Sequence, residues 1–163
     1  MAEVKSTVFG LDQSEWGSML LLKAEESDRY LVIPVSMESF QSLVLALEGQ
    51  DVPCGTSHDA MKEMITVLEA PMEKAVIHDI KNGSVLAKIY LRKNGETVQI
   101  NARPSDAVAL ALKTSSPIFV EDSVFERVAE NQKGVADERS NSQNLHSDAA
   151  LAWLASLNRL TKH

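Results

Sequence analysis

The sequence predicts an α+β fold in which duplicated βββα units form a mostly antiparallel sheet with helices packed on one face. Two observations indicate this class: runs of strand-like segments precede the apolar helices, and Asn-Gly turns join neighbouring strands. The third observation is a repeat, because a shift of 68 positions (106 − 38 = 68) places Glu38 on Asp106 and Ser36 on Pro104. The two halves are therefore expected to share one continuous sheet.

The composition of the 163 residues fits one globular domain with an appendage. A formal net charge of -7 argues against a general electrostatic grip on nucleic acid, which normally requires a basic face. The single cysteine, Cys54, excludes an internal disulfide framework and a multi-cysteine zinc site, and it is expected to be a small loop residue. The first residues lack a signal-peptide pattern and no apolar run approaches the ~20 residues of a membrane span, so a cytoplasmic location is expected.

The first half is predicted to begin with three strands, over residues 3–11, 18–25 and 30–35. The first segment alternates between two faces with a period of two. The second is apolar but short and bounded by turn residues, which favours a strand over a helix. Pro34 cannot donate a hydrogen bond to a ladder, so the third strand is expected at a sheet edge or to end there.

Two helices are predicted next. Ser36 is a suitable N-cap for the first, whose apolar residues recur at helical spacing until Gly49 ends it. After a loop at residues 50–56, Ser57 is expected to cap the second helix, which has one apolar side. His58 and Asp59 therefore fall at the first positions of that helix.

The second half is predicted to contain four more strands, of which the first three are joined by tight turns at Asn82-Gly83 and Asn94-Gly95. Asp122 is expected to cap a last helix that runs to about residue 130. The four strands are expected over residues 74–80, 85–92, 97–101 and 117–121, and a helix is expected over 104–113.

Three regions are expected along the chain. Residues 1–130 form the α+β domain, and the polar segment 131–145 is a flexible linker because it has almost no apolar residues. Residues 146–163 are expected to form an amphipathic helix. This helix either docks on its own domain or contacts another subunit or partner, since an isolated helix of that length is only marginally stable.

The stretch from residue 100 to 112 joins a strand end to a helix start and gathers polar side chains there. Proline suits the first helical turn and biases the preceding residue toward extended geometry, so Arg103 and Pro104 are expected at the junction. Ser105 and Asp106 then fall in the first turn, beside unpaired backbone N–H groups and the positive end of the helix dipole. An arginine, a hydroxyl and a carboxylate therefore converge in a candidate site.

A family signature lies in the same stretch. Asn101-Ala-Arg-Pro-Ser-Asp-Ala107 and Pro117-Ile-Phe-Val120 resemble the D-A-R-P-S-D-A and P-I-F-V segments of the bifunctional nuclease (BFN) domain family, and Ser57-His-Asp59 resembles its T-H-D. The resemblance covers roughly residues 4–130. The sequence departs from the pattern in having Asn101 where the family usually has aspartate, Ser57 in place of threonine, and Cys54-Gly55 in place of an arginine-proline pair.

This resemblance implies a compact homodimeric α+β domain with the nuclease activity on DNA and RNA that is attributed to some members. Phosphodiester hydrolysis requires neutralised phosphate charge and an activated water. Under a catalytic hypothesis, Arg103 binds phosphate, and Asp106 and Asp59 are candidate ligands for Mg²⁺ or Mn²⁺. His58 supplies the base and Asp59 the carboxylate that orients it. Ser105 adds a hydroxyl group. No organic cofactor and no membrane partner is expected.

The same residues also fit a structural role. Ser105 and Asp106 can satisfy the helix N-terminus, and Arg103 can pair with Asp106 or Asp59. Two functions therefore remain open from the sequence: a metal-dependent nuclease, and a non-enzymatic dimeric module that binds a partner or a small anion. Proximity of His58 to Asp106 is the geometric condition for a shared site.

Overall fold

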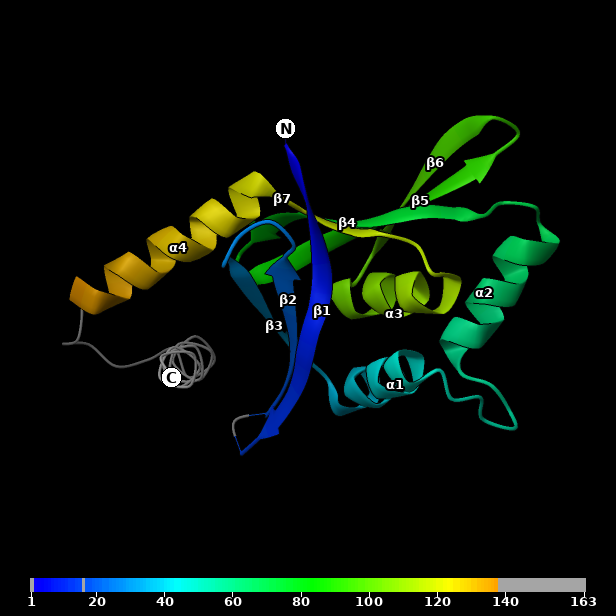
Figure 1. The fold of residues 1–163 in the computed structure, drawn as a ribbon, viewed down its shortest axis with the longest axis horizontal. Coiled ribbons are helices and arrows are strands. Elements are labelled where there is room, and N and C mark those ends of the chain that lie inside the picture. Colours follow the sequence, from blue (N-terminus) through cyan, green and yellow to red (C-terminus); the bar gives the residue numbers. More distant parts are fainter. Residues whose placement is uncertain (1, 16, 138–163) are drawn as a thin grey trace.

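The computed structural model describes residues 2–15 and 17–137, which form a seven-stranded sheet with four helices (Figure 1). The strands are β1 (Glu3–Ser14), β2 (Gly17–Ala24), β3 (Tyr30–Val35), β4 (Met72–Lys81), β5 (Ser84–Lys93), β6 (Glu96–Ala102) and β7 (Ile118–Glu121). The helices are α1 (Met37–Glu48), α2 (Ser57–Val67), α3 (Pro104–Thr114) and α4 (Asp122–Asp137). The predicted α+β class is confirmed. None of these helices is long and apolar enough to cross a membrane.

The strand order is β3-β2-β1-β7-β4-β5-β6. All described neighbours are antiparallel except β4 and β7, which run parallel. Strand β7 lies between β1 and β4, with Val120 opposite Val4 on one side and Ile77 on the other. A strand from late in the chain therefore joins two three-stranded meanders into the predicted continuous sheet. The origin of the meanders by duplication stays a prediction.

Two hairpin turns set the register of β4, β5 and β6. Asn82 and Gly83 have φ angles of 51° and 77°, and Asn94 and Gly95 have φ angles of 51° and 81°. Positive φ at both central residues is the requirement of a type I′ turn, which Asn-Gly meets at low cost. The predicted turns are therefore confirmed, and each joins its strands through two residues.

Other local signals are also confirmed. Pro34 lies in β3, which is an edge strand. The Ser36 hydroxyl accepts a hydrogen bond from the Ser39 backbone N–H at the start of α1, and Gly49 ends this helix with a φ of 61°. The side chain of Cys54 is exposed in the loop before α2. Short-range rules of capping and chain geometry therefore predict these positions.

Several boundaries differ from the predictions, and three of them have a clear consequence. Strand β1 extends to Ser14 because it pairs with β2 as far as Gly17. Thr56, not Ser57, is the N-cap of α2. Helix α4 continues to Asp137, so it includes the start of the segment predicted as a linker. The rest of that segment and the helix predicted over residues 146–163 lie outside the described residues.

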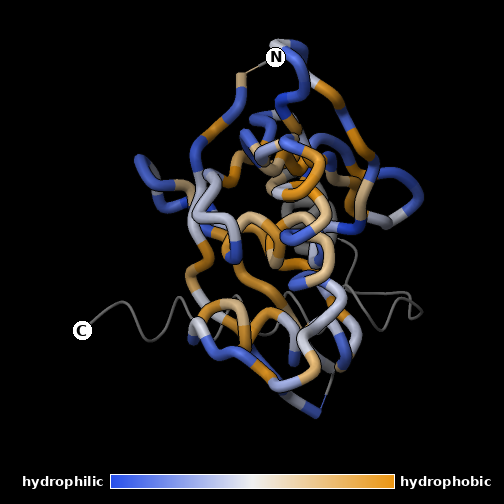
Figure 2. Tube along the Cα trace, turned by 90° about the vertical axis from the view of Figure 1, so that its right-hand side faces the viewer, coloured by the Kyte–Doolittle hydropathy of each residue, from blue (hydrophilic) through white to orange (hydrophobic). Residues whose placement is uncertain are grey.

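Helix α3 is the central helix of the fold. It contacts α1, α2, β4 and β5, and its residues from Ala107 to Ala111 are fully buried or nearly so. Side chains from all four helices join one core cluster with alternate residues of β2, as seen in the apolar interior of Figure 2. Figure 1 shows α3 between the sheet and α1, with α2 and α4 at opposite ends of the molecule. The first turn of α3 is therefore held in place by the core.

Candidate active site

The candidate site is built on the junction of β6 and α3. Arg103 is the N-cap residue, with extended φ and ψ angles of -68° and 147°, and Pro104 is the first helical residue. Ser105 is buried, at 6% exposure, in the first turn. Asp106 follows, with a side chain that is 23% exposed. The predicted junction is confirmed, and burial of α3 fixes the direction in which Asp106 points.

Asp106 joins two of the other predicted site residues. Its Oδ1 lies 3.0 Å from Nε2 of His58, at the start of α2. Arg103 donates from Nε to Oδ2 at 2.7 Å and from Nη2 to Oδ1 at 3.2 Å. The structure therefore meets the geometric condition of the shared-site hypothesis, since His58, Arg103 and Asp106 are in direct contact.

The surroundings of Asp106 favour its charged form. Burial of the carboxyl group raises its pKa, but the hydrogen bonds from Arg103 and His58 and their charges outweigh burial, so the pKa of Asp106 lies below its ordinary value of 3.8. The hydrogen bond and charge of Asp106 in turn raise the pKa of Arg103 above its ordinary value. At neutral pH the two side chains form a bidentate ion pair.

His58 is enclosed between the helices and only 6% exposed. Its Nε2 faces Asp106, whereas Nδ1 is buried and has no hydrogen-bond partner among the described residues. In the neutral tautomer that donates to Asp106, Nδ1 carries a lone pair. A buried nitrogen of this kind is costly unless something pairs with it, so Nδ1 is the unsatisfied polar group of the site.

Asp59 has different partners from those expected. It forms a capping box in which its Oδ2 accepts from the Thr56 backbone N–H at 2.6 Å while its own backbone N–H donates to Thr56 Oγ1 at 3.2 Å. Its Oδ1 accepts from Lys113 Nζ at 2.6 Å. The hydrogen bond from Lys113, followed by that from Thr56, lowers the pKa of Asp59 to about 2. Asp106, rather than Asp59, is thus the carboxylate beside the His58 ring.

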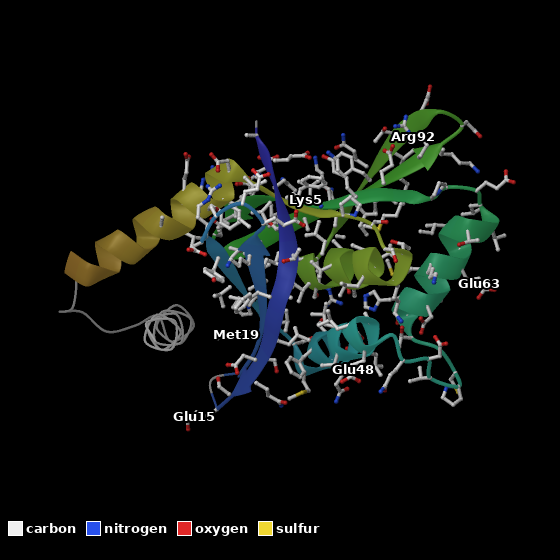
Figure 3. The ribbon with its side chains drawn as sticks, viewed as in Figure 1. Lys5, Glu15, Met19, Glu48, Glu63 and Arg92 are labelled. Carbon is white, nitrogen blue, oxygen red and sulfur yellow. The ribbon has the colours of Figure 1, made fainter. Side chains whose placement is uncertain are left out.

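Lys113 is the functional neighbour that the sequence interpretation missed. Its side chain is only 8% exposed because it lies between α3 and α2. The signal was present, since Lys113 follows Asp106 by seven residues (113 − 106 = 7) and therefore lies two turns further along the same side of α3. The spacing of Thr56 and Asp59 was likewise a capping-box signal. Figure 3 shows Glu63 on the opposite, outer side of α2.

The two expected metal ligands do not form a prepared metal site. Both oxygens of Asp106 and both oxygens of Asp59 accept hydrogen bonds, and each carboxylate is paired with a cationic side chain. Hard cations such as Mg²⁺ require about six oxygen ligands. Within residues 2–15 and 17–137, no group of three or more His, Cys, Asp or Glu side chains is placed to hold an ion. The donor set described here therefore does not fit Mg²⁺ or Mn²⁺.

Comparison with known proteins identifies the family of this chain. The model of the bifunctional nuclease domain matches residues 20–133. An uncharacterized protein of Mycobacterium tuberculosis is 30% identical over 125 residues, covering 77% of this chain and 74% of that protein. Bifunctional nuclease 1 of Oryza sativa is 28% identical over 105 residues, covering 62% of this chain but 32% of the rice protein. A family match that includes α1 to α3, and with them His58, Arg103 and Asp106, shows that the chain belongs to the bifunctional nuclease domain family.

Proposed function

We propose that the chain is a nuclease that cleaves phosphodiester bonds of DNA or RNA at the cluster of His58, Arg103 and Asp106. The observation that carries this proposal is the double contact of Asp106, which holds a histidine ring on one side and an arginine on the other. A histidine oriented by a carboxylate is a general-base arrangement, and arginine recognises phosphate. The rice relatives named bifunctional nucleases support the same reaction class.

Arg103 is the proposed phosphate ligand. Its side chain is 67% exposed although it is paired with Asp106, so part of the guanidinium faces solvent. Two of its N–H groups donate to Asp106, and the others can donate to phosphate oxygens. Because the net charge of the chain is -7, phosphate binding must come from such a local group rather than from an extended basic surface.

His58 is the proposed base. It accepts a proton from the attacking water at Nδ1 while Nε2–H stays hydrogen-bonded to Asp106, whose negative charge stabilises the imidazolium that forms. The water oxygen bonds to phosphorus, and the leaving oxygen departs with a proton taken from solvent. Since Nδ1 is buried, this role requires the start of α2 to open far enough for water to reach the ring. Ser105 is buried in the same turn as Asp106 and is given no step in this reaction.

A cleavage assay with matched variants tests the proposal. The full chain is incubated with fluorescent single- and double-stranded DNA and RNA, in Mg²⁺, in Mn²⁺ and in EDTA, so that the metal requirement expected from the sequence is measured in the same experiment. His58→Gln should lower the rate about a hundredfold or more, as expected for loss of a general base. Asp106→Asn should abolish cleavage. Asp79→Asn is the control, because Asp79 also pairs with an arginine, Arg127, but lies outside the site.

A non-enzymatic binding module is the second candidate. It is favoured by the internal pairing of the site charges, since Asp106 pairs with Arg103 and Asp59 with Lys113. Under this interpretation the contacts fasten α2 to α3 and do no chemistry. Absence of cleavage for every substrate and metal, in a protein with a cooperative unfolding transition, would support the binding module and contradict the nuclease. Cleavage that survives Asp106→Asn would indicate a contaminating enzyme or another site.

A further inference from the structure

We propose that the cavity between α2 and α3 binds a small zwitterion with an apolar side chain, the class of ligand to which the apolar α-amino acids belong. The cavity has a volume of about 330 Å³ and lies between the second half of α2, the last residue of α3 and the start of β4. His58, Arg103 and Asp106 do not line it. The inference goes beyond the proposed nuclease reaction and does not depend on it.

The buried part of the cavity lining is apolar. Met72 is 9% exposed and belongs to the main core cluster, and Ile65 is partly buried against the same cluster. Pro71 lies beside them, where the chain passes from the end of α2 into β4 (Figure 1). Sites for small molecules have volumes of roughly 300–1,000 Å³ and mostly apolar walls. This part of the cavity therefore suits a short aliphatic side chain.

Two charged side chains lie at the rim of the cavity. Lys62 and Glu69 are both exposed, and both contribute to the lining. In the part of the chain that the structure describes, neither of them forms an ion pair with another side chain. The rim therefore offers one ammonium group and one carboxylate to a ligand that carries the opposite pair of charges.

The ends of both helices add negative potential on one side of the cavity. Helix α2 has no basic residue in its last turn, and the basic residue in the last turn of α3, Lys113, is paired with Asp59 and does not line the cavity. The hydroxyl groups of Thr66 and Thr114 donate to carbonyl oxygens of their own helices and keep lone pairs that can accept. Because helix C-termini attract cations, this side of the cavity favours an ammonium group.

The two ends of the rim together select a zwitterion. An amine without a carboxylate would bring a second cation to Lys62, and a carboxylic acid without an amine would bring a second anion to Glu69. The seven positions between these residues (69 − 62 = 7) correspond to about 10 Å of helix length, which their long side chains can shorten. A free amino acid and a dipeptide carry the same groups at different separations, so both are compared in the test.

A ligand in the cavity would join α2 to α3. Lys62 lies one turn after Asp59, and Thr114 directly follows Lys113, so the cavity continues the helix contact beyond the Asp59–Lys113 ion pair. A molecule that binds only when the two helices are together stabilises that arrangement by mass action. Binding should therefore slow hydrogen exchange in α2.

Titration of the full chain with L-leucine and with leucylleucine, followed by calorimetry and by amide NMR, tests the proposal. Saturable binding with shifts at Ile65, Thr66, Glu69 and Thr114 is expected. The compounds 3-methylbutylamine and 4-methylpentanoate are leucine without its carboxylate and without its ammonium group, and each should bind about tenfold or more weakly. Tighter binding of leucine than of the dipeptide would identify a free amino acid as the ligand, and the reverse a peptide. No saturable binding of either zwitterion, or equal binding of the amine or the acid, overturns the proposal.

Matched variants locate the binding site without any measurement of nuclease activity. Lys62→Gln and Glu69→Gln should each raise the dissociation constant of the tighter zwitterion about tenfold or more, and Glu69→Gln should not weaken 4-methylpentanoate. Glu48→Gln is the control, because Glu48 is an exposed carboxylate on α1 that does not line the cavity (Figure 3). The zwitterion should slow hydrogen exchange in α2 of the wild type and of the control. Binding that survives both cavity substitutions, or that the control weakens equally, overturns the assignment.

Discussion

The ion pair between Asp59 and Lys113 joins the start of α2 to α3, and its contribution to stability can be measured. The Lys113 side chain is 8% exposed and the Asp59 side chain 30%. The hydrogen bond from Lys113, and then that from Thr56, lowers the pKa of Asp59 from 3.8 to about 2. This difference, 3.8 − 2 = 1.8, corresponds to about 2.4 kcal/mol of stability at 1.36 kcal/mol for each pKa unit. Solvent screening at a partly exposed carboxylate lowers the expected value to about 1.5–2 kcal/mol.

The perturbation is Asp59→Asn, which removes the charge but keeps an oxygen that can accept from the Thr56 backbone N–H. A pKa that is lower in the folded protein gives stability that is fully present above about pH 4 and is lost as the pH falls through about 2. Urea unfolding should therefore show a difference of about 1.5–2 kcal/mol between wild type and variant at neutral pH, falling to roughly half near pH 3.

Asp28→Asn is the control for this experiment. Asp28 pairs with Lys23 at 3.1 Å, but its side chain is 92% exposed, so the substitution should cost less than about 0.5 kcal/mol. A cost for Asp59→Asn that is no larger than the control, or that does not shrink on acidification, would show that the pair with Lys113 does not hold α2.

Three further predictions concern α3 and its contacts. Leu110→Ala should destabilise the protein by about 2–5 kcal/mol in urea unfolding, because Leu110 is 1% exposed in the core; a loss below about 1 kcal/mol would contradict its central position. Arg103→Ala should raise the pKa of Asp106 in an NMR titration, since burial would then be opposed mainly by His58, and an unchanged pKa would refute that account. Lys113→Met should speed hydrogen exchange at the start of α2 and leave that of β1 unchanged; equal changes in both would indicate global destabilisation.

Local rules predicted most of the elements of this fold. Positive φ at Asn-Gly turns, the capping of α1 and the geometry of the Arg103–Pro104 junction are each decided within a few residues, and the structure confirms them. The cap of α2 was misplaced by one position because Thr56 and Ser57 both carry hydroxyl groups. The spacing of Thr56 to Asp59 distinguishes them, since the capping box requires a carboxylate or amide three residues after the cap.

Long-range arrangement could not be predicted in the same way. Nothing in the four residues of β7 specifies that they lie between β1 and β4, because the choice depends on which strand edges the rest of the fold leaves open. The same limit explains why the sequence paired His58 with Asp59, whereas the structure pairs it with Asp106. Asp59 is adjacent to His58 in sequence but faces Lys113, whereas Asp106 reaches the imidazole through the packing of α2 against α3.

The packing of α2 reconciles a buried histidine with the proposed chemistry. His58 is the one fully buried residue of α2, and Met61 and Ile65 are only partly buried, whereas α3 buries most of its length. Helix α2 is therefore fastened largely by polar contacts at its start, those of His58 with Asp106 and of Asp59 with Lys113. Elements with few buried apolar contacts open at lower free energy than the global unfolding of the protein. An opening of the start of α2 that breaks the Asp59–Lys113 contact but keeps the His58–Asp106 hydrogen bond would admit water to Nδ1 of His58, so the burial of His58 and its proposed role as a base are compatible.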